Sequence, residues 1–232
     1  MQYMGGKHRH GKRLAQVINE YTEGGKPYYE PFCGALGVAV HVEAGNKHLS
    51  DGHPELIALW QALQNGWTPP ETVSREEYNE IKDDKNAPPE LRAFVGFGCS
   101  FGGKYFGCYA KGFCGERARN YAQESAHLAL KKIAKLKNAN FYHSDYKRVK
   151  PENSVIYCDP PYINTTGYKG VKFDHGGFYD WCEERAKSNI ILVSEYTMPN
   201  PFREVLSFER NMNINARAKT QKATEKLYIL GD

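Results

Sequence analysis

Residues 154–162 read Ser-Val-Ile-Tyr-Cys-Asp-Pro-Pro-Tyr, an apolar run that ends in Asp159-Pro160-Pro161-Tyr162. The apolar run predicts a buried strand, and the two prolines after it can continue neither a helix nor a sheet ladder. They stiffen a turn in which the Asp159 carboxylate and the Pro160 carbonyl face one point, beside the Tyr162 ring. Two hydrogen-bond acceptors and a flat ring suit a planar amine, such as the exocyclic nitrogen of adenine. The alternative is a proline turn with an ordinary capping aspartate.

A second pattern lies in residues 26–42, where Glu30-Pro31-Phe32 leads to Gly34 and Gly37 and then to the helix-like stretch 38–42. Strand, glycine turn and helix in this order are typical of the opening of a nucleotide-binding α/β unit. Glycine allows the backbone to approach a ligand closely. The match to G-x-G-x-x-G is poor because a third glycine is missing, so this pattern alone is weak.

Asp51 ends the short stretch Lys47–Asp51, about fourteen residues after Gly37. An acid at the end of the second strand of such a unit commonly holds ribose hydroxyls. The alternative is that Asp51 is the N-cap of a helix, which we predict over Pro54–Leu63.

These motifs follow Tyr3-Met-Gly-Gly-Lys7 in the order Glu30–Gly34, Asp51 and Asp159–Tyr162. The ordered set resembles the Dam-like family of DNA adenine-N6 methyltransferases, especially its phage-encoded members. The resemblance extends to three later stretches, residues 173–181, 193–196 and 222–228. It is weakest between residues 64 and 140.

The resemblance implies an α/β, Rossmann-like S-adenosylmethionine-dependent methyltransferase fold. Its mostly parallel sheet would end in an antiparallel C-terminal strand and carry a small inserted recognition domain. We expect residues 1–60 and 140–232 to form the catalytic domain and residues 61–139 the target-recognition insert. Strands over 140–146 and 190–194, a helix over 176–186 and a terminal hairpin of 202–209 with 224–230 would complete the catalytic domain.

The implied reaction is site-specific transfer of a methyl group from S-adenosyl-L-methionine to N6 of an adenine that is flipped out of double-stranded DNA. The catalytic residues would be Asp159, Pro160 and Tyr162. The resemblance suggests that Asp145 and Tyr146 contact the adenine of the cofactor. The complete set of expected cofactor-binding residues is Tyr3, Lys7, Glu30, Phe32, Gly34, Asp51, Asp145, Tyr146 and Asp159. Lys7 could contact either the cofactor or the flipped adenine, and the sequence does not choose between them.

Charge is distributed unevenly although the net charge is only +4. Residues 101–150 contain eleven Lys or Arg residues against three acids, which favours a phosphate-backbone partner. Glycines, aromatics and cations alternate in the loop 96–119, where we expect irregular structure. The expected DNA-binding residues are Lys104, Tyr105, Lys111, Arg117, Arg119 and Tyr168. The alternatives are a loop that packs its aromatics against the core, and lysines that form the solvated face of a helix over 119–137.

Two further expectations concern the insert. The capping-box sequence Ser74-Arg-Glu-Glu77 predicts the start of a helix. At roughly eighty residues the insert is short, so we expect a short recognition site or relaxed specificity; a methylation map with a long, strict site would contradict this.

Composition is typical of a soluble cytoplasmic protein of a bacterium or a phage-infected cell. The longest apolar runs are strand-sized, no leader opens the chain, and the six cysteines lack metal spacing and are expected to be reduced. We expect a monomer that needs no metal. Two other functions remain open: an amine methyltransferase that acts on cytosine N4, RNA or protein glutamine, and a non-catalytic DNA-binding subunit. An orphan, an anti-restriction and a restriction-paired role also remain open.

Overall fold

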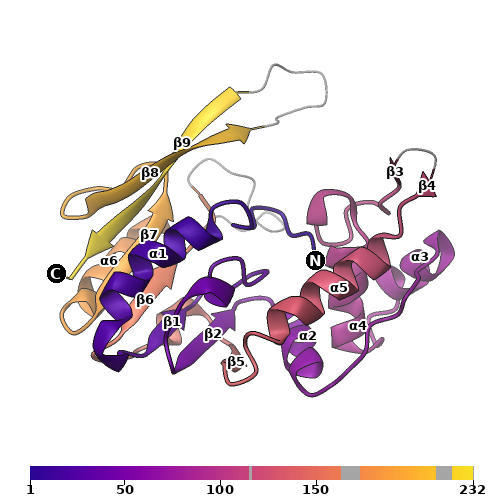
Figure 1. Ribbon diagram of the computed structural model, residues 1–232, viewed down its shortest axis with the longest axis horizontal. Helices are drawn as coiled ribbons and strands as arrows, with labels where there is room; N and C mark the ends of the chain where they lie inside the picture. Colours follow the sequence, from indigo (N-terminus) through magenta and orange to yellow (C-terminus); the bar gives the residue numbers. More distant parts are fainter. Residues whose placement is uncertain (115–116, 163–172, 213–220, 232) are drawn as a thin grey trace.

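The strand order β5-β2-β1-β6-β7-β9-β8 defines a seven-stranded sheet in the computed structural model, which describes residues 1–114, 117–162, 173–212 and 221–231 (Figure 1). The strands are β1 (Tyr28–Glu30), β2 (Lys47–Asp51), β5 (Asn140–His143), β6 (Val155–Cys158), β7 (Ile190–Glu195), β8 (Arg203–Met212) and β9 (Gln221–Leu230). All pairs from β5 to β7 are parallel, whereas β9 is antiparallel to β7 and β8. The predicted α/β fold class is therefore confirmed.

The side chains of β6 alternate between two apolar clusters, which explains why helices cover both faces of the sheet. Val155 and Tyr157 belong to the cluster that includes helix α1 (Gly11–Thr22). Ile156 and Cys158 belong instead to the cluster that includes helix α6 (His175–Ala186). Since successive side chains of a strand point to opposite faces, an uninterrupted apolar strand requires an apolar layer on each side.

In its described residues, the segment between β2 and β5 contains one strand pair, β3 with β4, which forms a sheet separate from the main one. Its elements lie to one side in Figure 1: α2 (Pro54–Gln64), α3 (Arg75–Asp83), α4 (Pro89–Ala93), the π-helical turn η3 (Phe94–Gly98), the 3-10 turn η4 (Phe101–Gly103), β3 (Phe113–Cys114), β4 (Arg117–Ala118) and α5 (Tyr121–Ile133). The helix predicted after Ser74 is confirmed, with a complete capping box between Ser74 and Glu77. The division into a catalytic domain and an insert stays a prediction.

Two local predictions are wrong. The helix expected after Gly37 is only the 3-10 turn η2 (Ala39–His41). The loop 96–119 begins with a buried helical turn, because residues 94–98 continue α4 as η3. A Cβ on Gly96 would lie 2.4 Å from the Tyr105 ring. The glycine here permits close packing and does not break the helix.

Two further elements of the described chain are short connections, the 3-10 turns η1 (Glu23–Gly25) and η5 (Tyr146–Arg148). The expected strand over 140–146 is thus shorter, because η5 follows β5 after two residues. None of the described helices combines the length and the hydropathy that crossing a bilayer requires.

Candidate active site

The carboxyl ends of the parallel strands bring three predicted acids to one edge of the sheet. Glu30 ends β1, Asp51 ends β2 and Asp159 directly follows β6. The strand order reverses between β1 and its neighbour β6. A crevice for ligands forms at such a reversal, outside the carboxyl ends of the strands. The edge at Glu30 and Asp159 is therefore the candidate active site.

Three side chains, from both ends of the chain and from the turn after β6, meet beside Asp159. The Lys7 Nζ atom donates to Asp159 Oδ1 at 2.6 Å and lies 3.2 Å from Glu225 Oε1. The Tyr162 hydroxyl donates to the same Glu225 oxygen at 2.6 Å. Lys7 Nζ also lies over the Tyr162 ring, 4.7 Å from its centroid. We call Lys7, Asp159, Tyr162 and Glu225 the acid–lysine cluster.

Burial makes the charges of this cluster interdependent. The side chains of Lys7 and Glu225 are 5% and 0% exposed, whereas that of Asp159 is 18% exposed. Burial raises the pKa of Asp159, the Lys7 ammonium opposes this rise, and the negative charge of Glu225 adds to it. Lys7 thus favours the ionised form of Asp159, which accepts hydrogen bonds only.

Close backbone contact between two motifs holds Lys7 in place. A Cβ on Gly37 would lie 3.1 Å from the Lys7 nitrogen, and a Cβ on Gly11 would lie 2.0 Å from the Gly37 oxygen. Gly11 also donates its N–H to the Lys7 carbonyl at 2.7 Å. Gly37 therefore admits the chain segment that carries Lys7 into the site.

Asp51 organises the glycine turn and does not cap a helix with its side chain. Its Oδ2 atom accepts from the Gly34 nitrogen at 3.0 Å and its Oδ1 atom from the His53 nitrogen at 2.9 Å. The N-cap of α2 is His53, whose ring nitrogen accepts from Leu56. Gly34 has φ +45°, and a Cβ there would lie 3.1 Å from the Tyr3 ring. Tyr3, Gly34 and Asp51 are thus brought together.

Glu30 is a buried carboxyl group next to this turn. It is 3% exposed, and the Tyr28 hydroxyl donates to its Oε2 atom at 2.7 Å. Burial raises the pKa of Glu30 to about 8, against the hydrogen bond from Tyr28, and the negative charges of Asp159 and Asp51 add to the rise. A nearby cation would lower the pKa of this buried carboxyl group and favour its ionised form.

We expect Glu30→Gln to be more stable than the wild type at pH 8. The pKa of Glu30 is raised on folding, so its ionisation costs stability progressively above its unfolded value and up to about pH 8. Glutamine removes this cost, which is on the order of a few kcal/mol. Thermal unfolding should show nearly equal Tm values at pH 5 and a higher Tm for the variant at pH 8. A constant difference across this range would contradict the prediction.

Phe32 and Tyr146 meet on the α6 side of the same edge. Their ring centroids lie 5.4 Å apart. Tyr146 is 7% exposed, and within the described residues its buried hydroxyl has no hydrogen-bond partner. Asp145 is exposed and accepts from the Lys147 nitrogen at 2.8 Å. It lines a hollow at the carboxyl ends of β2 and β5 with Gly52, His143, Ser144, Lys147 and Arg148.

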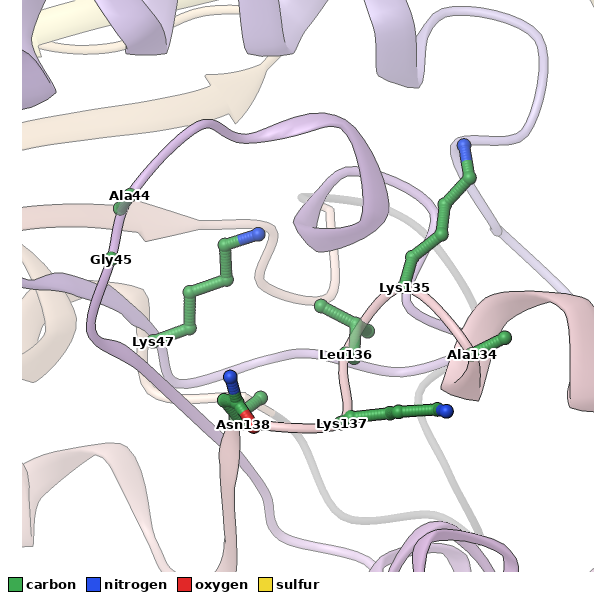
Figure 2. A pocket seen from close by; sticks show the side chains of 9 residues that line it. Ala44, Gly45, Lys47, Ala134, Lys135, Leu136, Lys137 and Asn138 are labelled. Atoms are coloured by element: carbon green, nitrogen blue, oxygen red, sulfur yellow. The ribbon is translucent and has the colours of Figure 1, made fainter.

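Figure 2 shows another hollow, which lies at the amino ends of the strands, opposite the carboxyl ends that carry Asp159. Residues 44–47 precede and open β2, and residues 134–139 follow α5. Its lining includes Lys47, Lys135 and Lys137. Because it lies at the amino end of β2, it is separate from the site at Asp159.

The residues predicted to bind DNA differ in environment. Lys104 and Lys111 are exposed. Arg119 is exposed but pairs with Glu124, with Nε donating to Oε1 at 3.0 Å. Tyr105 donates to Glu55 and packs 4.7 Å from the Phe97 ring centroid, which favours the alternative of a ring packed against the core. Arg117 lies in β4, and Tyr168 lies outside the described residues, as do the candidate substrate contacts Thr165 and Thr166.

Sequence reasoning missed Glu225 and Tyr196. The Tyr196 ring meets the Tyr162 ring edge-on, with centroids 4.9 Å apart. Both residues lie in stretches that carry the family resemblance, 193–196 and 222–228, but no local pattern marks either one as part of the site. The available signal for Glu225 was its position two and four residues before the apolar Leu227 and Ile229, on the same face of one strand.

Comparisons with known proteins agree with the motifs. Residues 3–91 match the model of the family described as D12 class N6 adenine-specific DNA methyltransferase. DNA adenine methylases of two Vibrio cholerae O1 strains, Ogawa 395 and El Tor Inaba N16961, are each 27% identical over 228 residues, which cover 83% of this chain and 78% of the relative.

Solved structures resemble the chain distantly. Precorrin 8w decarboxylase of Methanobacterium thermoautotrophicum gives a TM-score of 0.43 at 9% identity, over 95% of this chain and 90% of that one. Precorrin-6y C5,15-methyltransferase of Geobacter metallireducens gives 0.38 at 6% identity, over 94% and 87%.

The family match covers the Gly-Gly-Lys segment, the Glu30 motif and Asp51. Together with the Vibrio relatives, it confirms the enzyme class that the motifs predicted. Over residues 3–91 the chain is similar to the D12 class N6 adenine-specific DNA methyltransferases.

Proposed function

We propose that this protein transfers the methyl group of S-adenosyl-L-methionine to N6 of an adenine that is extruded from double-stranded DNA. One observation carries the proposal. At the carboxyl end of β6, a partly exposed Asp159 carboxylate lies beside the Tyr162 ring, and Lys7 favours its ionised form. The family match at residues 3–91 supports adenine in DNA as the target.

The role of Asp159 follows from the electronic structure of adenine. The lone pair on N6 is delocalised into the ring, so N6 of the free base is a poor nucleophile. Hydrogen bonds from the amino group to Asp159 and to the Pro160 carbonyl favour a pyramidal nitrogen whose lone pair is available. Tyr162 supplies an aromatic face, which offsets part of the unstacking cost of a few kcal/mol. Holding the nucleophile in line accounts for much of the acceleration.

The residues at the sheet edge fit the cofactor. S-adenosylmethionine, when bound, supplies an electrophilic methyl group on a sulfonium. Both Asp51 oxygens accept backbone N–H groups and keep further lone pairs for hydroxyls. Within the described residues the buried Tyr146 hydroxyl has no hydrogen-bond partner, and the Tyr146 ring meets the Phe32 ring. The preceding residue, Asp145, lines the hollow at the carboxyl ends of β2 and β5. We infer that Tyr3, Gly34, Asp51 and Glu30 hold the ribose and methionine parts, and that Phe32, Asp145 and Tyr146 hold the adenine.

The test of this proposal uses the purified chain and labelled S-adenosylmethionine with unmethylated plasmid, RNA or protein in separate reactions, and the plasmid is then digested to nucleosides. Label in N6-methyladenine is the expected result. Label in N4-methylcytosine, RNA or protein instead would replace adenine by the corresponding target. Cofactor binding with no transfer to any of them would favour a non-catalytic subunit. The reaction as proposed needs neither a metal nor a second subunit and takes place in the cytoplasm.

We expect Lys104→Ala and Lys111→Ala to weaken DNA binding without changing the recognition sequence. Both lysines are exposed, and a phosphate contact contributes affinity that is independent of sequence. Each substitution should reduce the slope of log K against log salt by about 1. Lys85→Ala is the matched control, because Lys85 is also exposed but follows the acidic helix α3. Equal effects of all three substitutions would indicate a general charge effect and would contradict phosphate contacts at 104 and 111.

A further inference from the structure

Lys7 lies where the proposed function requires the target base. The amino group of adenine needs Asp159 as an acceptor, and its ring needs the face of Tyr162. In the structure Lys7 Nζ lies 2.6 Å from Asp159 Oδ1 and 4.7 Å from the Tyr162 centroid, over the ring. A base that used these contacts would compete with the ammonium for both.

Glu225 offers the displaced ammonium another partner. Its Oε1 atom is 3.2 Å from Lys7 Nζ, so a small movement of a flexible lysine converts one ion pair into the other. Glu225 is fully buried in β9, opposite Phe208 of β8, and its hydrogen bond from Tyr162 fixes the carboxylate. A lysine that left Asp159 without such a partner would be a buried, unpaired charge.

We propose that Lys7 occupies the amino-group position before the base enters, and that Glu225 is a positioning residue that receives the Lys7 ammonium when the base binds Asp159. The inference rests on the proposed function. It assigns Glu225 a role through Lys7, without contact between Glu225 and the reacting atoms. The exchange keeps one cation beside two carboxylates throughout, so no net charge enters or leaves the cluster.

The decisive experiment is a double-variant cycle on kcat/KM for unmethylated DNA. Glu225→Gln keeps an acceptor for Tyr162 but removes the charge, and should lower kcat/KM by about 10- to 100-fold. In a Lys7→Met background the same substitution should leave kcat/KM unchanged or raise it, because no ammonium needs a new partner and the two carboxylates no longer repel. A role of Glu225 in holding Tyr162 alone would give the same loss in both backgrounds and would overturn the inference.

A second readout remains if Lys7→Met fails to fold. Glu225 raises the pKa of Asp159, so Glu225→Gln should move the acid limb of the kcat profile to lower pH. The charged and titratable groups that act on Asp159 or respond to it are Lys7, Glu225, Tyr162, Tyr157, Glu30 and Cys158. Glu225 is the one whose charge this variant removes. A purely structural role would lower Tm and leave the limb in place.

Glu204→Gln is the matched control. It removes a carboxylate from the same hairpin, but Glu204 is exposed and pairs with Lys226 at 2.7 Å. Its kcat/KM and pH profile should equal those of the wild type. Wild-type protein that transfers no methyl group to DNA would end the proposed function and, with it, this inference. An active wild type with additive effects of Lys7→Met and Glu225→Gln would end the inference alone.

Discussion

Asp159→Ala is expected to lower kcat for methyl transfer by about 10²- to 10³-fold, which is the usual effect of removing one preorganised hydrogen-bonding group from an active site. The carboxylate is 18% exposed at the end of β6 and is the acceptor closest to the Lys7 ammonium. Its loss leaves the amino group of adenine without its charged acceptor, whereas the glycine turn at Gly34 and the Asp51 contacts are unchanged. Affinity for S-adenosylmethionine, measured by calorimetry, should therefore change little.

Stability separates this effect from misfolding. Asp159 and Glu225 share one ammonium, so the alanine variant still contains a paired Lys7 and loses a repulsion between carboxylates. Its Tm should stay close to that of the wild type. Asp159→Asn keeps an acceptor oxygen without the charge and should fall between the two in kcat. Turnover retained by Asp159→Ala would end the assignment of this acceptor.

The site residues that could be predicted from the sequence are those that belong to short, contiguous motifs. The apolar run before Asp159 predicted β6, and parallel neighbours then had to place Glu30, Asp51 and Asp159 at one edge. Each of these residues ends or follows its own strand, so a local reading was enough to bring them together.

The role of the glycines could not be predicted, because it depends on partners far along the chain. Gly37 admits the backbone of Lys7, and Gly96 admits the ring of Tyr105. From the sequence, we expected Gly37 to allow close approach to a ligand and Gly96 to lie in irregular structure. A glycine in the sequence indicates that another group approaches the backbone closely, but it does not identify that group.

The acid–lysine cluster shows the same limit for charged residues. Lys7 and Asp159 are 152 positions apart, and Tyr162 and Glu225 are 63 apart. Only the antiparallel placement of β9 against β7 brings Glu225 to the carboxyl edge of β6. The hairpin was predicted, but its position in the strand order came from the fold.

Lys7→Met is expected to be the most destabilising single substitution in the site, at about 3–5 kcal/mol near pH 8, because removing one partner of a buried ion pair leaves uncompensated charge. Here one ammonium serves two carboxylates, and its side chain is only 5% exposed. Methionine is an unbranched side chain only one heavy atom shorter than lysine and fills most of the space over Tyr162, so the lost free energy reports charge more than volume. Chemical denaturation at several pH values measures it.

The pH dependence of the free energy of unfolding shows whether the destabilisation by Lys7→Met comes from charge. Without Lys7, the interaction that most strongly opposes the rise in the pKa of Asp159 is lost, while burial and Glu225 still produce that rise. A group whose pKa is raised on folding keeps its stability below the unfolded value, about 3.9 for aspartate, and loses it as the pH rises through the folded value. The deficit of Lys7→Met relative to the wild type should therefore be small near pH 5 and grow towards pH 8. Lys7→Arg, which keeps the charge, should show no such growth. A deficit of Lys7→Met that is equal at both pH values would mean that Lys7 supports the fold by packing, and the two carboxylates would then be stable neighbours without it.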